Sequence, residues 1–270
     1  MSKTILITGS TDGIGLETAK MLSEQGHTVL LHGRNSAKLE SAETTLAAVL
    51  PSSDGISSYQ ADLSRMQGVE KLATEVASGH TKLDVLINNA GVYMTPHSTT
   101  VDGLDVRFVV NTFAPYFLTE RLLPLLGSAG RVINLSSAAQ ATVDLSAMAG
   151  QRRIDDMTAY AQSKLALTMW SQEMGLKHKD TGPVFIAVNP GSLLASKMVK
   201  EGFGVDGSDL RIGADILCRA ALADEFADKS GQYFDNDIGK FSAPHSDALD
   251  ATKSARVVEA IKEIVSALEV

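Results

Sequence analysis

A glycine-rich turn near the start of the chain restricts the possible folds most strongly. The residues Thr8-Gly9-Ser10-Thr11-Asp12-Gly13-Ile14-Gly15 follow the apolar run Thr4-Ile5-Leu6-Ile7 and precede a stretch with the apolar spacing of a helix. Glycines in such a turn let the backbone approach a phosphate without a Cβ in the way, and the helix N-terminus directs N–H groups at the phosphate charge. The turn therefore predicts a strand, a nucleotide-binding loop and a helix, although a simple strand-to-helix connection has the same pattern.

The rest of the chain alternates short apolar strands with amphipathic helical stretches. Strands are predicted at Thr4 to Thr8, Thr28 to Leu31, Ser57 to Gln60, Val85 to Asn88, Val132 to Leu135, Val184 to Val188 and Gln232 to Phe234. Helices are predicted after Gly13, Asn35, Arg65 and Thr100, around Tyr160, and over Leu210 to Ala223 and Ser254 to Leu268. This alternation is typical of βαβ crossovers. We therefore predict an α/β protein with a single domain, residues 1–270, of the Rossmann type: a doubly wound parallel β-sheet flanked by helices on both faces.

Composition excludes several other classes of protein. A net charge of −8 without clustered Lys and Arg argues against a nucleic-acid partner. No apolar run approaches the roughly 20 residues that span a bilayer, so no membrane association is expected. Cys218 is the only cysteine, and the six histidines lack a metal-ligand spacing, so neither a disulfide nor a metal site is predicted. With no leader before the first strand, we expect the protein to be cytoplasmic.

A tyrosine and a lysine lie one helical turn apart in the middle of the chain. Tyr160 and Lys164 are four residues apart in a helical stretch, so their side chains share one face. A nearby cation lowers the pKa of a phenol and brings it closer to the working pH of a proton donor. Taken alone, the pair also fits an amphipathic helix with a half-buried tyrosine and a solvated lysine.

Several motifs in order along nearly the whole chain resemble the short-chain dehydrogenase/reductase family. The glycine-rich turn matches Thr8 to Gly15, the Asn-Asn-Ala-Gly motif matches residues 88–91, and the Tyr-x-x-x-Lys motif matches Tyr160 and Lys164. Asn111 matches the catalytic asparagine, and Ser137, rather than Ser136, matches the catalytic serine. Pro190-Gly191 resembles the loop beside the nicotinamide.

The resemblance implies hydride transfer between a nicotinamide and a carbonyl or alcohol. Tyr160 would exchange the proton, Ser137 would bind the substrate oxygen, Lys164 would hold the nicotinamide ribose, and Asn111 would support a water relay. The Ser137 and Asn111 side chains could instead form hydrogen bonds only with backbone groups. The cofactor-binding residues that it implies are Gly9, Ser10, Thr11, Asp12, Gly13, Ile14, Gly15, Arg34, Asn35, Asp62, Leu63, Asn89, Ala90, Gly91, Tyr160, Lys164, Pro190 and Gly191.

The end of the second strand indicates which nicotinamide cofactor binds. A carboxylate about 20 residues after the glycines commonly binds the ribose hydroxyls of NAD, whereas an arginine there suits the 2′-phosphate of NADP. The strand ends in Leu31-His32-Gly33-Arg34-Asn35, without a carboxylate. Arg34, assisted by Lys38, could bind the phosphate, so we predict NADP(H), with NAD(H) as the second choice. A solvated Arg34 at a surface turn, and a helix-capping Asp62, are the alternatives.

Two segments depart from the usual family pattern. Tyr160 comes 23 positions after Ser137, whereas about a dozen residues are common, and a similar extension occurs in the branch that resembles retinol dehydrogenases. The long 138–156 segment could contact a large or apolar substrate, pack its own apolar residues, or contact another subunit. After Pro190-Gly191 the usual threonine is replaced by Ala195 or, with a shift of one residue, Ser196; Phe203 could belong to a lid.

Three functions are compatible with these motifs. An NADP-dependent oxidoreductase with a small carbonyl or alcohol substrate is favoured, since all four catalytic positions are filled. A non-enzymatic NADP(H)-sensing regulatory protein would not need them. An epimerase or dehydratase of the same superfamily usually carries an added C-terminal domain, for which the chain is short. The resemblance also implies a homodimer or homotetramer, formed through the tyrosine-bearing helix and the helix before it.

Overall fold

The computed structural model describes residues 1–49, 56–195, 198, 200, 202 and 204–268, and contains one eight-stranded sheet. The strand order is β3-β2-β1-β4-β5-β6-β7-β8, and every neighbouring pair is parallel except β7 and β8. The strands are β1 Thr4–Ile7, β2 Thr28–Gly33, β3 Ile56–Gln60, β4 Val85–Asn88, β5 Arg131–Leu135, β6 Val184–Asn189, β7 Gln232–Asp235 and β8 Lys240–Ser242. The predicted Rossmann-type sheet is therefore confirmed, with one additional strand.

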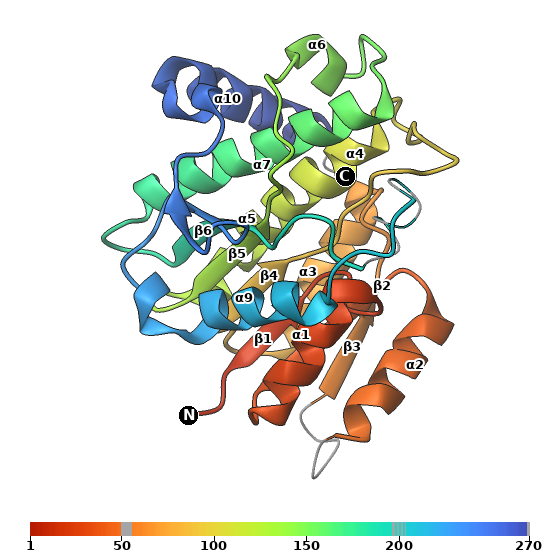
Figure 1. The fold of residues 1–270 in the computed structure, drawn as a ribbon, viewed down its shortest axis with the longest axis vertical. Coiled ribbons are helices and arrows are strands. Elements are labelled where there is room, and N and C mark those ends of the chain that lie inside the picture. Colours follow the sequence, from red (N-terminus) through yellow and green to blue (C-terminus); the bar gives the residue numbers. More distant parts are fainter. Residues whose placement is uncertain (50–55, 196–197, 199, 201, 203, 269–270) are drawn as a thin grey trace.

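Helices cover both faces of this sheet (Figure 1). One face carries α1 Gly13–Glu24, α2 Ser36–Ala47 and α9 Leu210–Leu222. The other carries α3 Met66–Gly79, α5 Ala114–Leu126, α7 Asp156–Lys177 and α10 Ala251–Leu268. Short helical segments connect these layers: α4 Val106–Phe108, the π-helical turn Val109–Phe113, α6 Leu145–Met148, and the 3₁₀ turns Asp224–Phe226 and Ser246–Leu249.

The sequence pattern of the strands explains the two-sided core. All residues of β4 and β5 are buried, so apolar residues stand next to one another in these strands, as in Val85–Ile87 and Val132–Ile133, instead of alternating with exposed polar ones. Strand β8 has no such run, because it has only three residues, all at least partly exposed, at the antiparallel edge of the sheet. A pattern based on buried apolar residues therefore missed it.

The long 138–156 segment packs its own apolar residues. Met148 in α6 is fully buried, and Val143, Leu145 and Ile154 pack against the same core cluster as α5 and α7. Asp144 caps α6 by accepting hydrogen bonds from the backbone of residues 146 and 147. Among the three predicted roles of this segment, packing of its own side chains is the one that the described contacts support.

Helix α10 lies along the outer side of α7 (Figure 1). Val257, Val258, Ile261 and Val265 of α10 are buried in the core that α7 shares, and Lys262 Nζ lies 3.0 Å from Glu173 Oε1 on α7. The helix begins at Ala251, three residues before the predicted start, after Asp250 accepts hydrogen bonds from the N–H groups of Thr252 and Lys253. The helix that carries Tyr160 is thus covered by the chain's own C-terminal helix.

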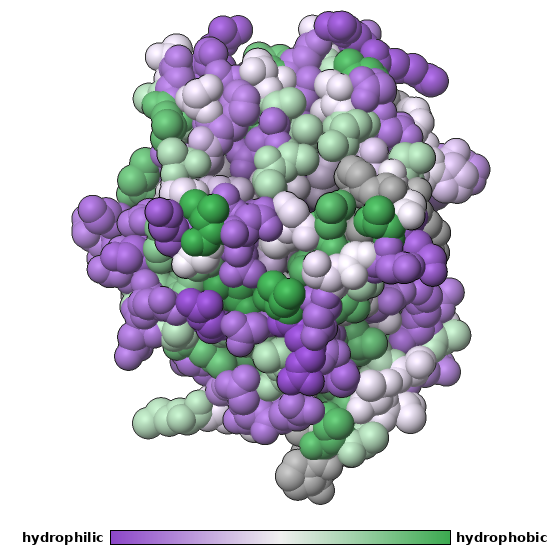
Figure 2. Space-filling view, viewed as in Figure 1, coloured by the Kyte–Doolittle hydropathy of each residue, from purple (hydrophilic) through white to green (hydrophobic). Residues whose placement is uncertain are grey.

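The face shown in Figure 2 is largely hydrophilic, with separate hydrophobic side chains across its middle. Exposed apolar residues near the segment after β6 include Leu193, Val205 and Ile212. Within the described ranges, the structure contains no helix with the length and apolar character needed to cross a membrane.

Candidate active site

The glycine-rich turn packs directly against the end of β4. Gly9 and Gly13 have φ angles of +66° and +54°, a region that residues with a Cβ rarely adopt. A Cβ on Gly9 would lie 2.9 Å from Ala90 Cα, and a Cβ on Gly15 would lie 2.4 Å from Asn89 Nδ2. These contacts give a physical reason for glycine at both positions.

Asn89 and Thr8 hold the turn in place through four hydrogen bonds. Asn89 Nδ2 donates to the carbonyl oxygens of Thr8 (2.9 Å) and Gly9 (3.0 Å). Thr8 Oγ1 accepts from the backbone N–H groups of Asn89 (3.1 Å) and Ala90 (3.0 Å). The neighbouring Asn88 is buried, and its Nδ2 donates to Asn134 Oδ1 (2.8 Å) inside the sheet. The Asn-Asn-Ala-Gly motif therefore combines one core residue with one residue that shapes the turn.

A cleft of about 380 Å³ runs along the carboxyl ends of the central strands, where ligands bind in open α/β sheets. Most of the predicted cofactor-binding residues line it: Gly9, Thr11, Asp12, Gly13, Ile14, Gly15, Arg34, Asp62, Leu63, Asn89, Ala90, Gly91, Tyr160, Lys164 and Pro190. Ser10, Asn35 and Gly191 do not. The fold thus brings together residues from six separate segments of the chain.

The polar side chains of Ser10 and Asn35 are used by the fold instead. Ser10 is fully buried, and its Oγ accepts from the backbone N–H of His32 (2.9 Å). Asn35 is the N-cap of α2, and its Oδ1 accepts from the backbone N–H of Lys38 (3.0 Å). Side-chain contact between either residue and a cofactor is therefore not supported by the structure.

Three charged side chains lie at the cleft end next to β2. Lys38 Nζ forms an ion pair with Asp12 Oδ2 at 3.0 Å, so its charge is already partly balanced. Asp62 Oδ1 accepts from the N–H and the hydroxyl of Ser64, rather than capping α3, whose N-cap is Arg65. Arg34 is exposed and lines the cleft, and no carboxylate of the described chain lies within ion-pair distance of its guanidinium. Arg34 is therefore the available cation at this end.

A buried histidine that the sequence analysis did not single out supports the glycine-rich turn. The Nδ1 atom of His32 accepts from the backbone N–H of Gly9 (3.1 Å), and Nε2 lies 3.2 Å from the carbonyl oxygen of Ala61. These partners assign the proton of the neutral ring to Nε2. Burial lowers the pKa of His32 to about 4, so the ring is neutral near neutral pH. No sequence motif marks His32 for this role, because the fold alone brings it to Gly9 and Ala61.

Tyr160 and Lys164 line the inner end of the cleft, and Ser137 lies next to Tyr160. Tyr160 is half-buried, and its hydroxyl is hydrogen-bonded to the Ser137 side chain. Lys164 Nζ lies 5.7 Å from the centroid of the Tyr160 ring. Burial raises the pKa of Tyr160 above its usual value, although the bond from Ser137 acts in the opposite direction. The predicted lowering of this pKa by Lys164 is therefore wrong for the structure without a bound ligand, because desolvation of the phenolate is the larger effect.

Lys164 is almost completely buried at the floor of the cleft. Its side chain is 4% exposed, and Nζ donates to the carbonyl oxygen of Leu135 at 2.7 Å. Burial lowers the pKa of Lys164 to about 8. A Cβ on Gly91 would lie 3.5 Å from Nζ, so the backbone of the Asn-Asn-Ala-Gly motif passes directly over the ammonium. The cleft floor therefore presents a positive group with unused donor capacity.

Asn111 lies behind these groups rather than in the cleft lining. It belongs to the π-helical turn Val109–Phe113, a conformation often found at functional sites. Its Nδ2 donates to Val92 O and Ser163 Oγ, both at 3.0 Å, and its Oδ1 accepts from Val92 N at 2.8 Å. Asn111 thus joins the segment after β4 to the helix that carries Tyr160 and Lys164.

An aspartate that follows the neighbouring strand β7 holds the loop that begins at Pro190. The Asp237 carboxylate accepts from Ser192 N (2.7 Å), Ser192 Oγ (2.6 Å) and Asn189 Nδ2 (2.8 Å). Burial raises the pKa of Asp237, but the bonds from Ser192 and Asn189 outweigh it, so the pKa lies below its usual value. No sequence motif marks Asp237, because the turn between β7 and β8 meets this loop only in the folded chain.

Further residues complete the description of the site. Gly191 N donates to Asn189 Oδ1 (3.4 Å), and Ala195 N pairs with Ser208 O (2.6 Å) at the base of the loop. Ser196 and Phe203 lie outside the described residues. Within the described ranges there is no cluster of His, Cys, Asp or Glu that could hold a metal ion. The chemistry available at the cleft is thus proton transfer at a phenol, beside a hydroxyl and a buried ammonium.

Comparison with known proteins agrees with this geometry. Residues 3–203 match the family model for short chain dehydrogenases. The chain is 30% identical to human retinol dehydrogenase 13, over 95% of this chain and 84% of the relative. It is 34% identical to mouse retinol dehydrogenase 12, over 86% of this chain and 77% of the relative.

Solved structures share the fold over most of their length. The crystal structure of a protein from Mycobacterium paratuberculosis superposes with a TM-score of 0.79 and 26% identity, over 98% of this chain and 93% of that one. A Shigella flexneri structure, described as a short chain dehydrogenase complexed with NADP, has a TM-score of 0.68 and 26% identity, over 87% of this chain and 96% of that one. Taken with the cleft and its polar groups, these matches place the chain in the short-chain dehydrogenase/reductase family of oxidoreductases, in the branch that resembles retinol dehydrogenases.

Proposed function

We propose that the protein is an NADP(H)-dependent oxidoreductase that interconverts a carbonyl compound and an alcohol. The observation that supports this most is the buried Lys164 ammonium beside the Tyr160–Ser137 pair at the cleft floor. Burying an ammonium that donates to a backbone carbonyl oxygen rather than to a carboxylate costs free energy, and such arrangements cluster at functional sites. A protein that only bound the cofactor would not need this arrangement.

The residues at the cleft floor have separate tasks in the proposed reaction. The nicotinamide, when bound, supplies or accepts the hydride. Tyr160 gives its hydroxyl proton to the substrate oxygen during reduction and takes it back during oxidation. Ser137, already bonded to that hydroxyl, keeps the substrate oxygen within reach. Lys164 would donate to the nicotinamide ribose and stabilise the phenolate, while Asn111 joins the π-helical turn to the helix that carries Lys164.

Arg34 supports NADP(H) as the preferred cofactor. Its guanidinium has several donors in a plane, which suits the 2′-phosphate, and the described cleft has no carboxylate at the end of β2 to bind the ribose hydroxyls of NAD. Lys38, paired with Asp12, contributes less. The Shigella flexneri structure that contains NADP adds support by analogy.

The substrate that we propose is an apolar aldehyde, ketone or alcohol. Two relatives are named as retinol dehydrogenases, which supports an apolar substrate by analogy only. The buried residues of the 138–156 segment pack in the core, so substrate contact falls to side chains nearer Tyr160.

A cofactor titration followed by a turnover screen tests the proposal. Purified protein is titrated with NADPH and NADH by cofactor fluorescence, together with Arg34→Ala and a control, Arg152→Ala, whose side chain pairs with Asp144 outside the cleft. NADPH should bind at least about tenfold more tightly than NADH, and only Arg34→Ala should remove the preference. Equal binding of both cofactors by the unaltered protein would contradict the phosphate assignment. NADPH binding without turnover on any aldehyde, ketone or alcohol of a broad apolar panel would favour the sensor function.

That the protein forms a homo-oligomer stays a prediction from the family, and the position of α10 restricts which surface can form the contact. Assembly through α7 and the helix before it is expected, yet α10 already covers the outer side of α7 in this chain. We propose that a contact between copies on this side includes α10. Light scattering after size-exclusion chromatography gives the stoichiometry, and reversal of an exposed charge on α10, by Glu259→Lys, should weaken the contact.

The cytoplasm is likewise our proposal for the location. Cys218, the only cysteine, is a buried free thiol, and burial raises its pKa to about 12, so it is inert in the fold. Cell fractionation of the tagged full chain tests the location directly.

A further inference from the structure

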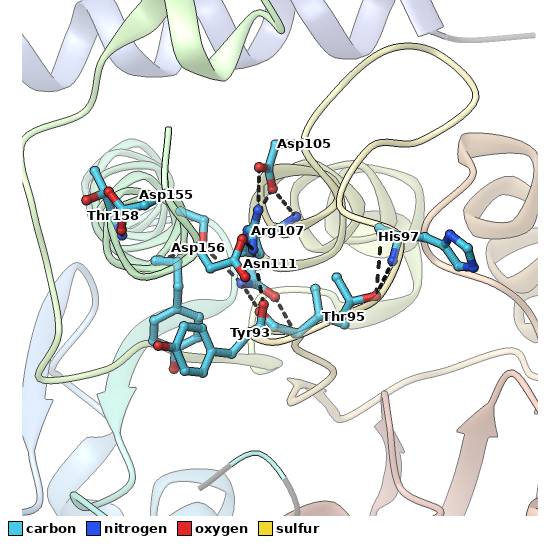
Figure 3. A network of polar contacts seen from close by, with 12 residues as sticks. Tyr93, Thr95, His97, Asp105, Arg107, Asn111, Asp155, Asp156 and Thr158 are labelled. Atoms are coloured by element: carbon cyan, nitrogen blue, oxygen red, sulfur yellow. Dashed lines mark hydrogen bonds and ion pairs between the residues drawn. The ribbon is translucent and has the colours of Figure 1, made fainter. Parts of the chain in front are cut away.

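A buried arginine connects the segment after β4 with the start of α7. The Arg107 side chain, on α4, is 1% exposed. Its Nε and Nη2 donate to Asp105 Oδ1 (2.9 Å) and Oδ2 (2.7 Å), which makes a two-bond pair with one carboxylate. Its Nη1 lies 2.5 Å from Asp156 Oδ1 and donates to Tyr93 O at 3.3 Å. Figure 3 shows Arg107 at the centre of these partners.

The partners of Arg107 belong to elements that surround the phenol of Tyr160. Asp156 is in the first turn of α7, four residues before Tyr160, so the two lie one turn apart. The ring of Tyr93 is buried, and its centroid lies 5.2 Å from that of Tyr160, at an interplanar angle of 54°. The Arg107 guanidinium therefore binds both the backbone of Tyr93 and the helical turn that precedes Tyr160.

Two further contacts restrict where the Tyr93 ring can lie. Asn111, one helical turn after Arg107, forms two bonds with the backbone of Val92. On another side, a Cβ on Gly202 would lie 2.4 Å from Tyr93 Cε1, so Gly202 packs against the ring. Tyr93 thus packs against Tyr160 and Gly202, and with Val92 and Met94 it also lines a second cleft beside the first.

The geometry of the guanidinium matters more here than its charge alone. A planar fork with fixed directions can bind two carboxylates and a carbonyl at defined angles, which a lysine cannot reproduce. Buried ion pairs contribute little net stability in general, because desolvation offsets the attraction. A positional role accounts for the arrangement better than a stabilising one.

We propose that Arg107 is a positioning residue that sets the gap between the rings of Tyr93 and Tyr160, and that Tyr93 forms the wall on which the non-reacting part of an apolar substrate packs. The first half concerns the folded chain alone. The second half rests on the proposed oxidoreductase function. An aromatic ring beside the reacting oxygen favours substrates with a flat or bulky apolar substituent.

Fluorine NMR of the fluorotyrosine-labelled protein tests the first half without any turnover. The chain has five tyrosines, and the resonances of Tyr93 and Tyr160 are assigned from the Tyr93→Phe and Tyr160→Phe variants. Asp156→Ala and Arg107→Lys should shift or broaden both resonances and leave those of the other tyrosines unchanged. The control Glu173→Ala removes an ion pair of the same helix far from the site and should change neither. Unchanged Tyr93 and Tyr160 resonances in both variants would overturn the positioning role. If Arg107→Lys does not fold, Asp156→Ala alone decides.

Kinetics with two apolar aldehydes, one short and one bulky, tests the second half. Both variants should raise KM for the bulky aldehyde about tenfold and for the short one less than about twofold, with NADPH affinity and the pH midpoint of kcat unchanged. An equal rise in KM for both aldehydes would contradict the proposal that Tyr93 forms the wall on which the substrate packs. If the unaltered protein reduces neither aldehyde, the proposed function fails, while the NMR result still decides the role of Arg107.

Discussion

Lys164 makes the stability of the folded chain depend on pH in a way that the structure predicts. The pKa of this lysine falls from 10.5 to about 8 on burial. A lowered lysine pKa means that the unfolded chain binds more protons than the folded chain between these two values, so this group makes unfolding harder as pH rises through that window. The perturbation that isolates the effect is Lys164→Met, which keeps most of the side-chain volume and removes the charge.

The size of the effect follows from the two pKa values. The shift corresponds to roughly 3 kcal/mol of destabilisation near pH 7, where both states hold the proton, and about 2 kcal/mol of it is relieved by about pH 9.5. The variant also loses the hydrogen bond to Leu135 O, but that loss does not change with pH and cancels from the comparison. Relative to Lys164→Met, the unaltered protein should therefore gain about 2 kcal/mol, or roughly 4–8 °C in Tm, between about pH 7 and about pH 9.5.

Thermal unfolding without cofactor, monitored by circular dichroism at several pH values, measures this difference. Lys177→Met is the matched control, because Lys177 lies in the last turn of the same helix and is exposed. Its Tm should follow that of the unaltered protein at every pH. A Tm difference between the unaltered protein and Lys164→Met that stays constant over the whole range would refute the reasoning, because it would mean that the ammonium is hydrated in the folded state.

Further predictions concern residues that shape the cleft. Burial lowers the pKa of His32 from 6.5 to about 4, so the folded chain should lose about 3 kcal/mol of stability as pH falls through that interval. Urea unfolding at several pH values measures this loss, and His32→Asn should make the stability depend less on pH. An equally steep loss of stability in the variant would contradict the prediction. Asp237→Ala should free the Pro190–Ser192 loop and weaken NADPH binding about tenfold, as measured by titration, whereas Asp228→Ala, at an exposed ion pair, should have no effect. Equal affinities for the two aspartate variants would show that the loop does not depend on Asp237.

The fold and the cleft floor could be predicted from the sequence because their determinants are local. Parallel strands buried on both faces are continuous apolar runs, and the glycine-rich turn, the Asn-Asn-Ala-Gly motif and the Tyr160–Lys164 pair are short patterns. Fifteen of the predicted cofactor-binding residues line the cleft for this reason. Ser10 and Asn35 do not line the cleft, because their side-chain oxygens bind backbone N–H groups, and the sequence does not distinguish this use from ligand binding.

The supporting residues could not be predicted, since their partners are distant in the sequence. Asp237 meets Ser192 from the turn after the neighbouring strand β7, His32 meets Gly9 from the next strand, and Arg107 meets Asp156 from another helix. The pKa of Tyr160 was predicted in the wrong direction because the sequence shows a neighbouring lysine but not the depth of burial. Burial is a property of the whole fold, and it decides the sign here.

The most direct test of the account is the rate of NADPH oxidation with a panel of apolar aldehydes, compared between the unaltered protein and Tyr160→Phe. The variant lacks only the hydroxyl that bonds to Ser137, so it should fold and bind NADPH as before while kcat falls by at least about a hundredfold. An unchanged kcat in Tyr160→Phe, with a cofactor affinity equal to that of the unaltered protein, would show that the proton comes from another group and would contradict the proposed mechanism.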